Sequence, residues 1–197
     1  MIWVVIVIVV VIVLLLLWLV AMFNKLVRLR NRAENAWAQV DVQLRKRYDL
    51  IPNLVETVKG YAAHEKEVLE GVVRARAAAV QVPPGPEILK DSGKFSDYER
   101  SQTELSGALG RLLAIVENYP DLKANTNVMQ LQEELTTTEN QISFSRQHYN
   151  ATVLDFNNAI QTFPAVLVAG ILGFVKREFF DAEPEASEVP KVDLSLG

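Results

Sequence analysis

The chain has 197 residues, no cysteine and a formal net charge of −4. This length leaves room for one soluble domain of ordinary size beside an apolar N-terminal run. The absence of cysteine excludes disulfide frameworks, thiolate zinc sites and cysteine nucleophiles. Charge is spread unevenly, since residues 25–76 carry eleven basic and seven acidic side chains and residues 181–197 carry one and five. The basic part therefore lies directly after the apolar run.

The apolar run at residues 2–23 contains no charged or strongly polar side chain. As a helix it would be about 33 Å long, enough to cross the hydrocarbon core of a bilayer. Trp3 and Trp18 lie toward its two ends, where indole rings favour the membrane interface. A cleaved signal peptide is the alternative, but there is no basic n-region, the run is too long, and no small-x-small site follows it. We therefore expect a transmembrane anchor at residues 1–23.

Basic residues flank this span on one side only. The four that follow it are Lys25, Arg28, Arg30 and Arg32. Because basic flanks are retained in the cytoplasm, the sequence predicts a single-pass protein with its N-terminus outside and its body cytoplasmic. The same side chains either bind anionic lipid headgroups, at about 1 kcal/mol each, or act only as the topology signal.

From Ala33 to Ala79, apolar side chains recur at alternating steps of four and three residues. Arg47 and Glu65 are the exceptions. A mean step of 3.5 residues is typical of a helix that buries one stripe in a bundle or coiled coil. Pro52 interrupts this helix, and we expect a kink rather than two helices, because the spacing continues in register on both sides. The proline-rich stretch at residues 82–86 then ends the helix and begins a linker.

Two more helices are expected. Residues 96–99 have the pattern of a capping box and start the second helix, which runs to a turn at residues 118–121. The third begins near Asn127, carries a seam of the same period and ends at Pro164. The side chains expected to pack the first helix against the other two are Trp37, Leu44, Ile51, Leu54, Val58, Ile142, Tyr149, Val153 and Phe156. The predicted fold is all-α, with one transmembrane helix continuing into an antiparallel helical bundle of long coiled-coil-like helices at residues 24–180.

The C-terminal region leaves alternatives open. Residues 165–175 are apolar but reach only about halfway across a bilayer as a helix. They could dip into a membrane surface, cap the bundle, or pack against another subunit. Residues 181–197 form an acidic, proline-containing tail, which its composition predicts to be disordered unless it docks along a helix.

Three separated blocks of sequence carry a resemblance to a known family, at residues 30–61, 117–125 and 131–140. Residues 146–153 and 189–192 fit as well. The positions that carry it most clearly are Asn35, Asp49, Pro52, Asn53, Tyr119, Pro120, Asn125 and Asn150. The chain resembles the LemA family of bacterial membrane proteins. That resemblance implies an anchor in the bacterial inner membrane, a cytoplasmic antiparallel helical bundle, no established catalysis, and a role in membrane organisation or envelope quality control.

The sequence does not complete a known catalytic pattern. His64 and Glu65 begin like a zinc-protease helix, but position 68 is valine where that chemistry needs a second histidine. A metal site among the carboxylates of helix three would lack the Glu-x-x-His pattern of helical bundles. Basic residues abut the membrane and the rest is acidic, which disfavours nucleic-acid binding. We expect no enzyme activity and no cofactor.

Two functions remain. The first is a scaffold that self-associates on the cytoplasmic face of the membrane, because helix one has a longer apolar seam than helix two can cover. The second is an adaptor or regulator of a membrane protease or signalling protein. The expected partners are the lipid bilayer and further copies of the chain, or another membrane protein if the chain is an adaptor.

Overall fold

The computed structural model describes residues 1–62, 64–82 and 85–181. Its α-helices are α1 (Ile2–Lys59), α2 (Lys66–Gln81), α3 (Ser92–Asn118), α4 (Pro120–Lys123) and α5 (Thr126–Gln161), with 3-10 turns η1 (Ile88–Lys90) and η2 (Ala165–Leu167). No strand occurs among the residues described. The prediction of an all-α fold with one long apolar N-terminal helix and a helical bundle is confirmed.

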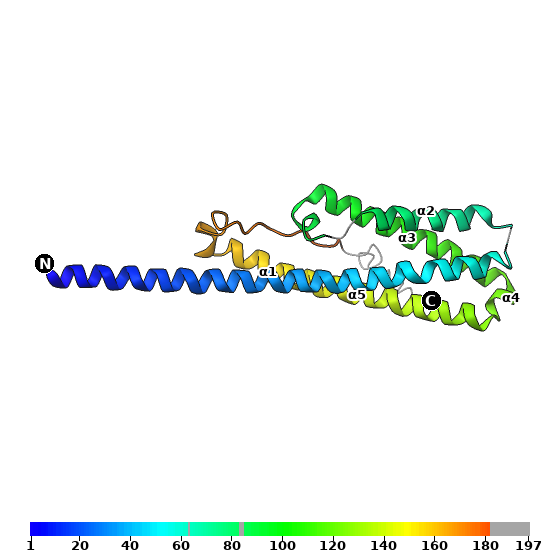
Figure 1. Ribbon diagram of the computed structural model, residues 1–197, viewed down its shortest axis with the longest axis horizontal. Helices are drawn as coiled ribbons and strands as arrows, with labels where there is room; N and C mark the ends of the chain where they lie inside the picture. Colours follow the sequence, from blue (N-terminus) through cyan, green and yellow to red (C-terminus); the bar gives the residue numbers. More distant parts are fainter. Residues whose placement is uncertain (63, 83–84, 182–197) are drawn as a thin grey trace, which may run out of the picture.

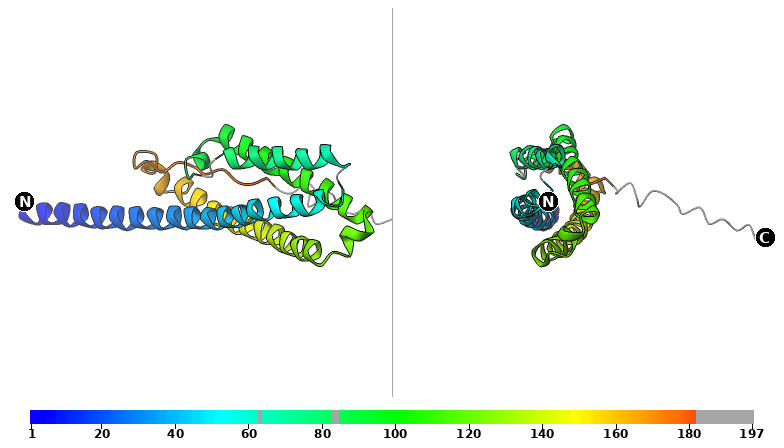
Figure 2. Two further views of the ribbon diagram at one scale, coloured as in Figure 1. Left: turned by 45° about the vertical axis from the view of Figure 1, so that its right-hand side comes forward. Right: turned by 90° about the vertical axis from the view of Figure 1, so that its right-hand side faces the viewer.

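The bundle is antiparallel and α1 extends far beyond it (Figure 1). From the distal end of α1 the chain returns as α2, runs out again as α3, turns through α4 and comes back as α5. The most extensive packing is between α1 and α5, followed by that between α2 and α3. Viewed end-on, α2, α3 and α5 curve around one side of α1 (Figure 2).

The prediction that one kinked helix reaches Ala79 is wrong. α1 ends at Lys59, and α2 begins at Lys66 and folds back alongside it. The periodicity misled because both helices bury their apolar stripes in the same cluster, which includes Val58 and Val72. Spacing that stays in register across a reversal cannot by itself be told from one continuous helix.

Pro52 lies inside α1, as expected, and does not end the helix. Proline lacks the N–H that would bond to the carbonyl four residues earlier, here that of Tyr48. Instead, Nε of Arg76 on α2 donates to the Tyr48 oxygen at 2.8 Å. The returning helix thus supplies the hydrogen bond that Pro52 removes.

The starts of α3 and α5 can be compared with the predicted helix starts, and only that of α3 differs by more than one residue. α3 begins at Ser92, because the Asp91 side chain accepts from the Lys94 backbone N–H at 3.1 Å and caps the helix there. The capping box expected at residues 96–99 therefore lies inside the helix, and Asp91 is an equally favourable N-cap residue that comes first. α5 begins at Thr126, capped by Asn125, close to the predicted start.

The buried side chains form three clusters along the bundle. The distal cluster joins α1, α2, α3 and α5 and is aliphatic; its members include Ile51, Leu54, Val58, Leu69, Val72, Leu105, Leu109, Leu112 and Leu135. The aromatic cluster contains Trp37, Phe95, Tyr98, Tyr149 and Phe180, with Leu44, Ile142 and Val153 beside them. The proximal cluster, nearest the apolar end of α1, contains Leu26, Phe156, Ile160, Ala165, Ala169 and Phe174.

Candidate functional site

The N-terminal third of α1 exposes an apolar surface along its whole length. None of the residues in its most apolar 18-residue window is buried. Ile6, Val10 and Leu14 are each about half exposed or more. The helix is long and apolar enough to cross a membrane. Lipid is the environment that suits a helix that is apolar on every side.

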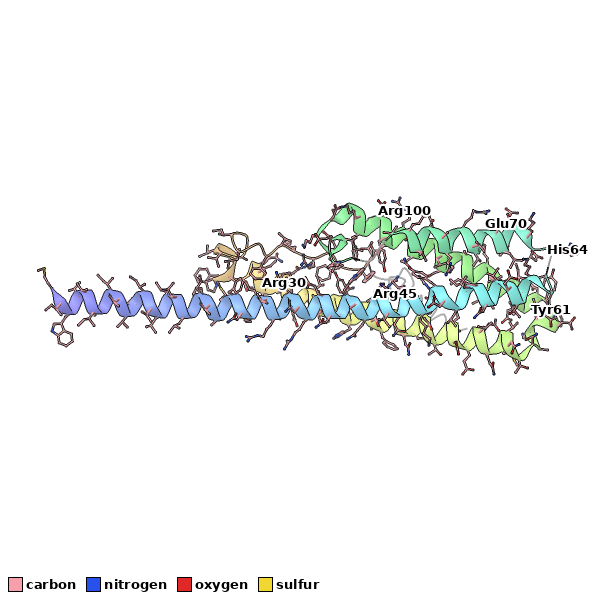
Figure 3. All side chains as sticks on the ribbon, viewed as in Figure 1. Arg30, Arg45, Tyr61, His64, Glu70 and Arg100 are labelled. Carbon is pink, nitrogen blue, oxygen red and sulfur yellow. The ribbon has the colours of Figure 1, made fainter. Side chains whose placement is uncertain are left out.

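The four basic residues that follow this surface differ in their exposure. Lys25, Arg28 and Arg32 are exposed. Arg30 instead places its guanidinium 5.6 Å from the ring centroid of Phe174, and its Nε is buried. Arg30 lies on the part of α1 that runs beside the C-terminal segment (Figure 3). The exposed three are available to lipid headgroups, whereas Arg30 ties the C-terminal segment to the anchor helix.

The nine side chains predicted to form the helix seam are all buried in the structure. They divide by height along α1: Ile51, Leu54 and Val58 lie in the distal cluster; Trp37, Leu44, Ile142, Tyr149 and Val153 in the aromatic cluster; and Phe156 in the proximal cluster. The Trp37 ring stacks on that of Phe180 at 5.6 Å between centroids. Phe180 was outside the predicted seam, so the C-terminal segment completes a core that the helices alone leave open.

A buried arginine lies between the distal and aromatic clusters. Arg47 is fully buried, and its guanidinium donates to Glu139 and Ser106, each at 3.1 Å, and to Gln102. Gln102 also bonds with the hydroxyl of Tyr48. A buried charge needs such partners, because desolvation alone would make it strongly unfavourable. Arg47 was an exception in the apolar spacing, and that exception was the available sign of a buried arginine paired with a partly exposed carboxylate.

Residues 176–181, here called the strap, run extended along α5 and antiparallel to it. The Asn157 side chain donates to the Arg177 carbonyl at 2.9 Å and accepts from the Arg177 N–H at 3.0 Å. Asn150 makes the same pair of bonds with Phe180, at 3.0 and 2.9 Å. Two amides on one helix face therefore hold the backbone of the strap.

The spacing of these amides matches the geometry of an extended chain. Asn150 and Asn157 are two helical turns apart, about 10.5 Å at 1.5 Å per residue. Arg177 and Phe180 are separated by three extended residues, about 10 Å. The match lets both amides reach equivalent backbone positions at once. Asn150 was singled out from the family resemblance, whereas Asn157 was missed.

Side-chain contacts of the strap strengthen this attachment. Tyr149 donates its hydroxyl proton to the Glu178 carbonyl at 2.9 Å. The Arg177 guanidinium is buried, lies 5.9 Å from the Phe156 ring centroid and donates to Glu34 on α1 at 3.2 Å. Burial raises the pKa of the Tyr149 phenol well above its usual range, so the hydroxyl remains a donor at physiological pH.

The other family-motif residues lie at the distal end or on the surface. Tyr119 donates to the Glu65 carboxylate at 3.2 Å, and the Asn125 amide donates to the Tyr61 hydroxyl at 3.1 Å. Pro120 is the first residue of α4. These contacts join the turn between α1 and α2 to the turn between α3 and α5. Asn35, Asp49, Pro52 and Asn53 have exposed side chains on α1.

Metal-ligating side chains do not gather within residues 1–62, 64–82 and 85–181. No group of three or more His, Asp or Glu residues in that part of the chain is placed to hold a metal ion. Burial raises the pKa of the Tyr98 phenol far above its usual range, so that group stays neutral.

The architecture defines a class: an antiparallel four-helix bundle whose first helix projects as an apolar, membrane-length rod. The family model of the LemA family matches residues 36–194, and the chain belongs to that family. The family and the exposed apolar rod together make it a membrane-associated protein.

Individual relatives align over most of the chain. Magnetosome protein MamQ of Magnetospirillum gryphiswaldense is 27% identical over 188 residues, covering 87% of this chain and 69% of the relative. Magnetosome protein MamQ 2 of Paramagnetospirillum magneticum is 25% identical, covering 90% and 71%. Protein LemA of Metamycoplasma hominis is 27% identical over 171 residues, covering 87% and 72%.

Proposed function

We propose that this protein is a non-catalytic scaffold that holds a rigid helical bundle on the cytoplasmic face of the bacterial inner membrane. The observation that carries the proposal is the continuity of α1, which runs without a break from the apolar rod into all three clusters. The 36 residues of α1 beyond residue 23 extend about 54 Å at 1.5 Å per residue. Such a helix sets how far the bundle extends from the membrane.

The topology within this proposal follows from the exposed cations Lys25, Arg28 and Arg32, which favour a cytoplasmic body. A membrane-impermeant label applied to intact cells should reach a reporter fused before Met1 and miss one fused after Gly197. The opposite labelling pattern would place the bundle outside the cytoplasm and overturn this orientation.

Self-association is the second component of the proposal, and it rests on exposed apolar side chains rather than on a surplus of apolar seam. The expected surplus of apolar seam on helix one does not exist, because α2 folds back and shares the distal cluster with α1. The bundle leaves large apolar side chains exposed that support self-association: Val42 on α1, and Phe144 and Leu154 on α5. Parallel anchoring in one membrane would raise the local concentration of copies that carry such side chains.

Single-cysteine crosslinking in native membranes tests self-association, and it is clean because the chain has no cysteine of its own. We expect Val42→Cys or Phe144→Cys to yield crosslinked dimers, whereas Asn158→Cys, exposed on α5, serves as the background position. The mass of the detergent-extracted particle measures the oligomeric state independently. A monomeric particle without self-crosslinks at either position would remove self-association from the proposal.

A groove between α1 and α2 favours the adaptor as a second candidate. It lies at the distal end, has a volume of about 540 Å³, and combines the apolar side chains of Val55, Leu69 and Val73 with a charged rim of Glu56, Lys59, Lys66, Glu70 and Arg74. An amphipathic helix of a partner would fit such a surface. Capture of one discrete foreign protein through Val73→Cys, in the absence of self-crosslinks at Val42 and Phe144, would favour this function over the scaffold.

A further inference from the structure

Residues 162–175, here called the foot, form an uncharged segment between the end of α5 and the strap. No charged residue occurs between Asp155 and Lys176. The foot folds into η2 and successive turns beside α1, next to the apolar rod (Figure 1). It begins where the bundle ends, on the side that faces the membrane anchor.

One side of the foot caps the bundle. Ala165, Ala169 and Phe174 are buried in the proximal cluster against Leu26 and the last turns of α5. Of the three alternatives that the sequence left open for residues 165–175, capping therefore describes this side. It holds the foot at a fixed place on α1.

The opposite side of the foot is apolar and uncovered. Phe163 is 79% exposed, Val166 50%, Leu167 65% and Ile171 86%. Single exposed apolar residues are ordinary, but four large ones within nine residues form a patch of the kind that marks a contact surface. The capping role needs none of these four side chains.

The foot lies at the level where α1 leaves the bilayer. The rings of Phe23 and Phe174 are 5.7 Å apart between centroids. A recess of about 310 Å³ between the two segments is lined by Trp18, Met22 and Lys25 on one side and by residues 162–165 on the other. Trp18 and Lys25 bracket the transition from apolar rod to basic flank. When α1 spans the membrane, the exposed side of the foot is therefore at the cytoplasmic boundary of the hydrocarbon.

The backbone of the foot is also suited to this environment. Its internal hydrogen bonds use the N–H groups of residues 166, 167, 168, 169, 172, 173 and 174, each paired with a carbonyl between residues 162 and 170. Gly173, at a φ of 76°, permits the last of these turns. A segment that enters the membrane boundary must satisfy most of its peptide groups internally, because hydrocarbon offers no partners.

We propose that the foot is a second membrane contact, which inserts Phe163, Leu167 and Ile171 into the cytoplasmic leaflet beside α1. The inference rests on the anchoring role of α1 and adds a distinct site to it. A single spanning helix leaves the protein free to tilt and to rotate about the axis of that helix. A second insertion point beside the helix fixes which side of the bundle faces the membrane and restrains its tilt.

Depth-dependent quenching in the full-length protein tests the foot. Ile171→Cys carries an environment-sensitive nitrobenzoxadiazole label, and the protein is reconstituted in vesicles of phosphatidylethanolamine and phosphatidylglycerol with or without spin-labelled lipid. We expect blue-shifted emission, quenching by the spin-labelled lipid, and protection from aqueous iodide. Thr136→Cys, exposed on α5 away from the foot and outside the proposed self-association contact, is the control position on the bundle and should show the reverse.

A label at Val11→Cys separates the two proposals. Lipid quenching at Val11 without lipid quenching at Ile171 would overturn the foot and leave the anchor intact. Absence of lipid quenching at Val11 would overturn the anchor itself. Blue-shifted emission at Ile171 without lipid quenching, together with an Ile171 self-crosslink, would assign the surface to a second copy of the chain and contradict membrane insertion.

A charged variant provides an independent measurement. The double substitution Leu167→Glu and Ile171→Glu changes exposed side chains only, so the helical content should be retained. We expect a label at Phe163→Cys to lose its lipid quenching in this variant, while the label at Val11 keeps it. Unchanged quenching at Phe163 would contradict the proposal.

Discussion

The distal cluster joins α1, α2, α3 and α5, whereas the aromatic cluster joins only α1, α3 and α5 of these helices and is built by different means. The distal cluster is aliphatic and is supplied by the stripes of α1, α2, α3 and α5. The aromatic cluster has rings whose centroids lie 5.2 to 6.4 Å from their neighbours, and one of the rings, Phe180, comes from the strap. Toward the apolar rod, an extended segment held by asparagine amides thus contributes the core packing that α2 contributes at the distal end. The distal half of the bundle is therefore formed by helices with regular apolar periodicity, whereas the half that contains the aromatic cluster also needs an irregular segment to complete its core.

The largest expected losses of stability come from truncating one buried side chain in each cluster. Trp37→Ala should lower the free energy of unfolding by about 3–5 kcal/mol, because it removes a buried ring that contacts four other aromatic rings. Ile51→Ala in the distal cluster should cost about 2–5 kcal/mol. Urea denaturation of the detergent-solubilised protein, followed by circular dichroism, measures both.

Limited trypsin digestion makes this comparison sharper. Under native conditions Trp37→Ala should speed cleavage after Lys176 and Arg177, because the Phe180 ring loses the surface on which it stacks. Ile51→Ala should leave that cleavage slow. Equal acceleration in both variants would mean that the two clusters open as one unit, and the distinction drawn between them would be lost.

The next effect concerns the strap alone. Asn157→Ala leaves the peptide group of Arg177 without its two side-chain hydrogen bonds in a buried position, which should cost about 1–3 kcal/mol. The measurement is the rate of tryptic cleavage after Arg177, which should rise. Asn158→Ala, one residue further and exposed, should change the stability by less than about 0.5 kcal/mol and leave the cleavage rate as it is.

The contrast between the clusters also explains what the sequence could predict. The long seams, the apolar N-terminal helix and the helix ends near Asn125 and Pro164 follow from periodicity and local signals, and these determine the all-α fold. Periodicity did not locate the reversal after Lys59, because α1 and α2 bury their stripes in one cluster. The expectation of a single rod to Ala79, and the surplus seam built on it, failed for that reason.

The strap could not be found from periodicity at all. An extended segment has no helical spacing, and its residues 176–181 include charged ones that would ordinarily be placed in solvent. The available signal was indirect: Asn150 and Asn157, seven residues apart, lie on the apolar side of a helix where amides need partners. The sequence also predicts that the acidic tail is disordered unless it docks along a helix. That prediction concerns residues 182–197, which lie outside the described part of the chain.

A smaller effect tests how the distal half accommodates Pro52. Arg76→Ala removes the donor to the Tyr48 carbonyl and should cost about 0.5–1.5 kcal/mol. In a Pro52→Ala background, the restored N–H of residue 52 can bond to that carbonyl, so the same Arg76→Ala change should cost less. A double-mutant cycle by urea denaturation measures the coupling. Equal costs in both backgrounds would show that Arg76 acts by another contact.

The smallest effect concerns the electrostatics of the strap. The Glu99 carboxylate on α3 accepts the backbone N–H of Asp181 at 3.0 Å. Burial, together with the nearby carboxylates of Asp181 and Glu178, raises the pKa of Glu99, while that hydrogen bond and the charge of Arg146 lower it in part. The net effect is a raised pKa, so folding favours the protonated form of this side chain.

The sign of the pH dependence follows from that raised pKa. A group that binds its proton more tightly in the folded state contributes most to stability below its ordinary pKa of about 4.3, and this contribution falls as the pH rises through the folded-state pKa. Glu99→Gln keeps the acceptor oxygen and stays neutral at every pH. The variant should therefore be more stable than the parent at pH 7, by less than about 0.5 kcal/mol for so partly exposed a side chain, and the gain should disappear near pH 4. Glu104→Gln, exposed on the same helix, is the control for general charge effects.

Tryptic cleavage after Arg177 at pH 7 should slow in Glu99→Gln alone, and faster cleavage would mean that the charge of Glu99 helps to hold the strap rather than weakening its attachment.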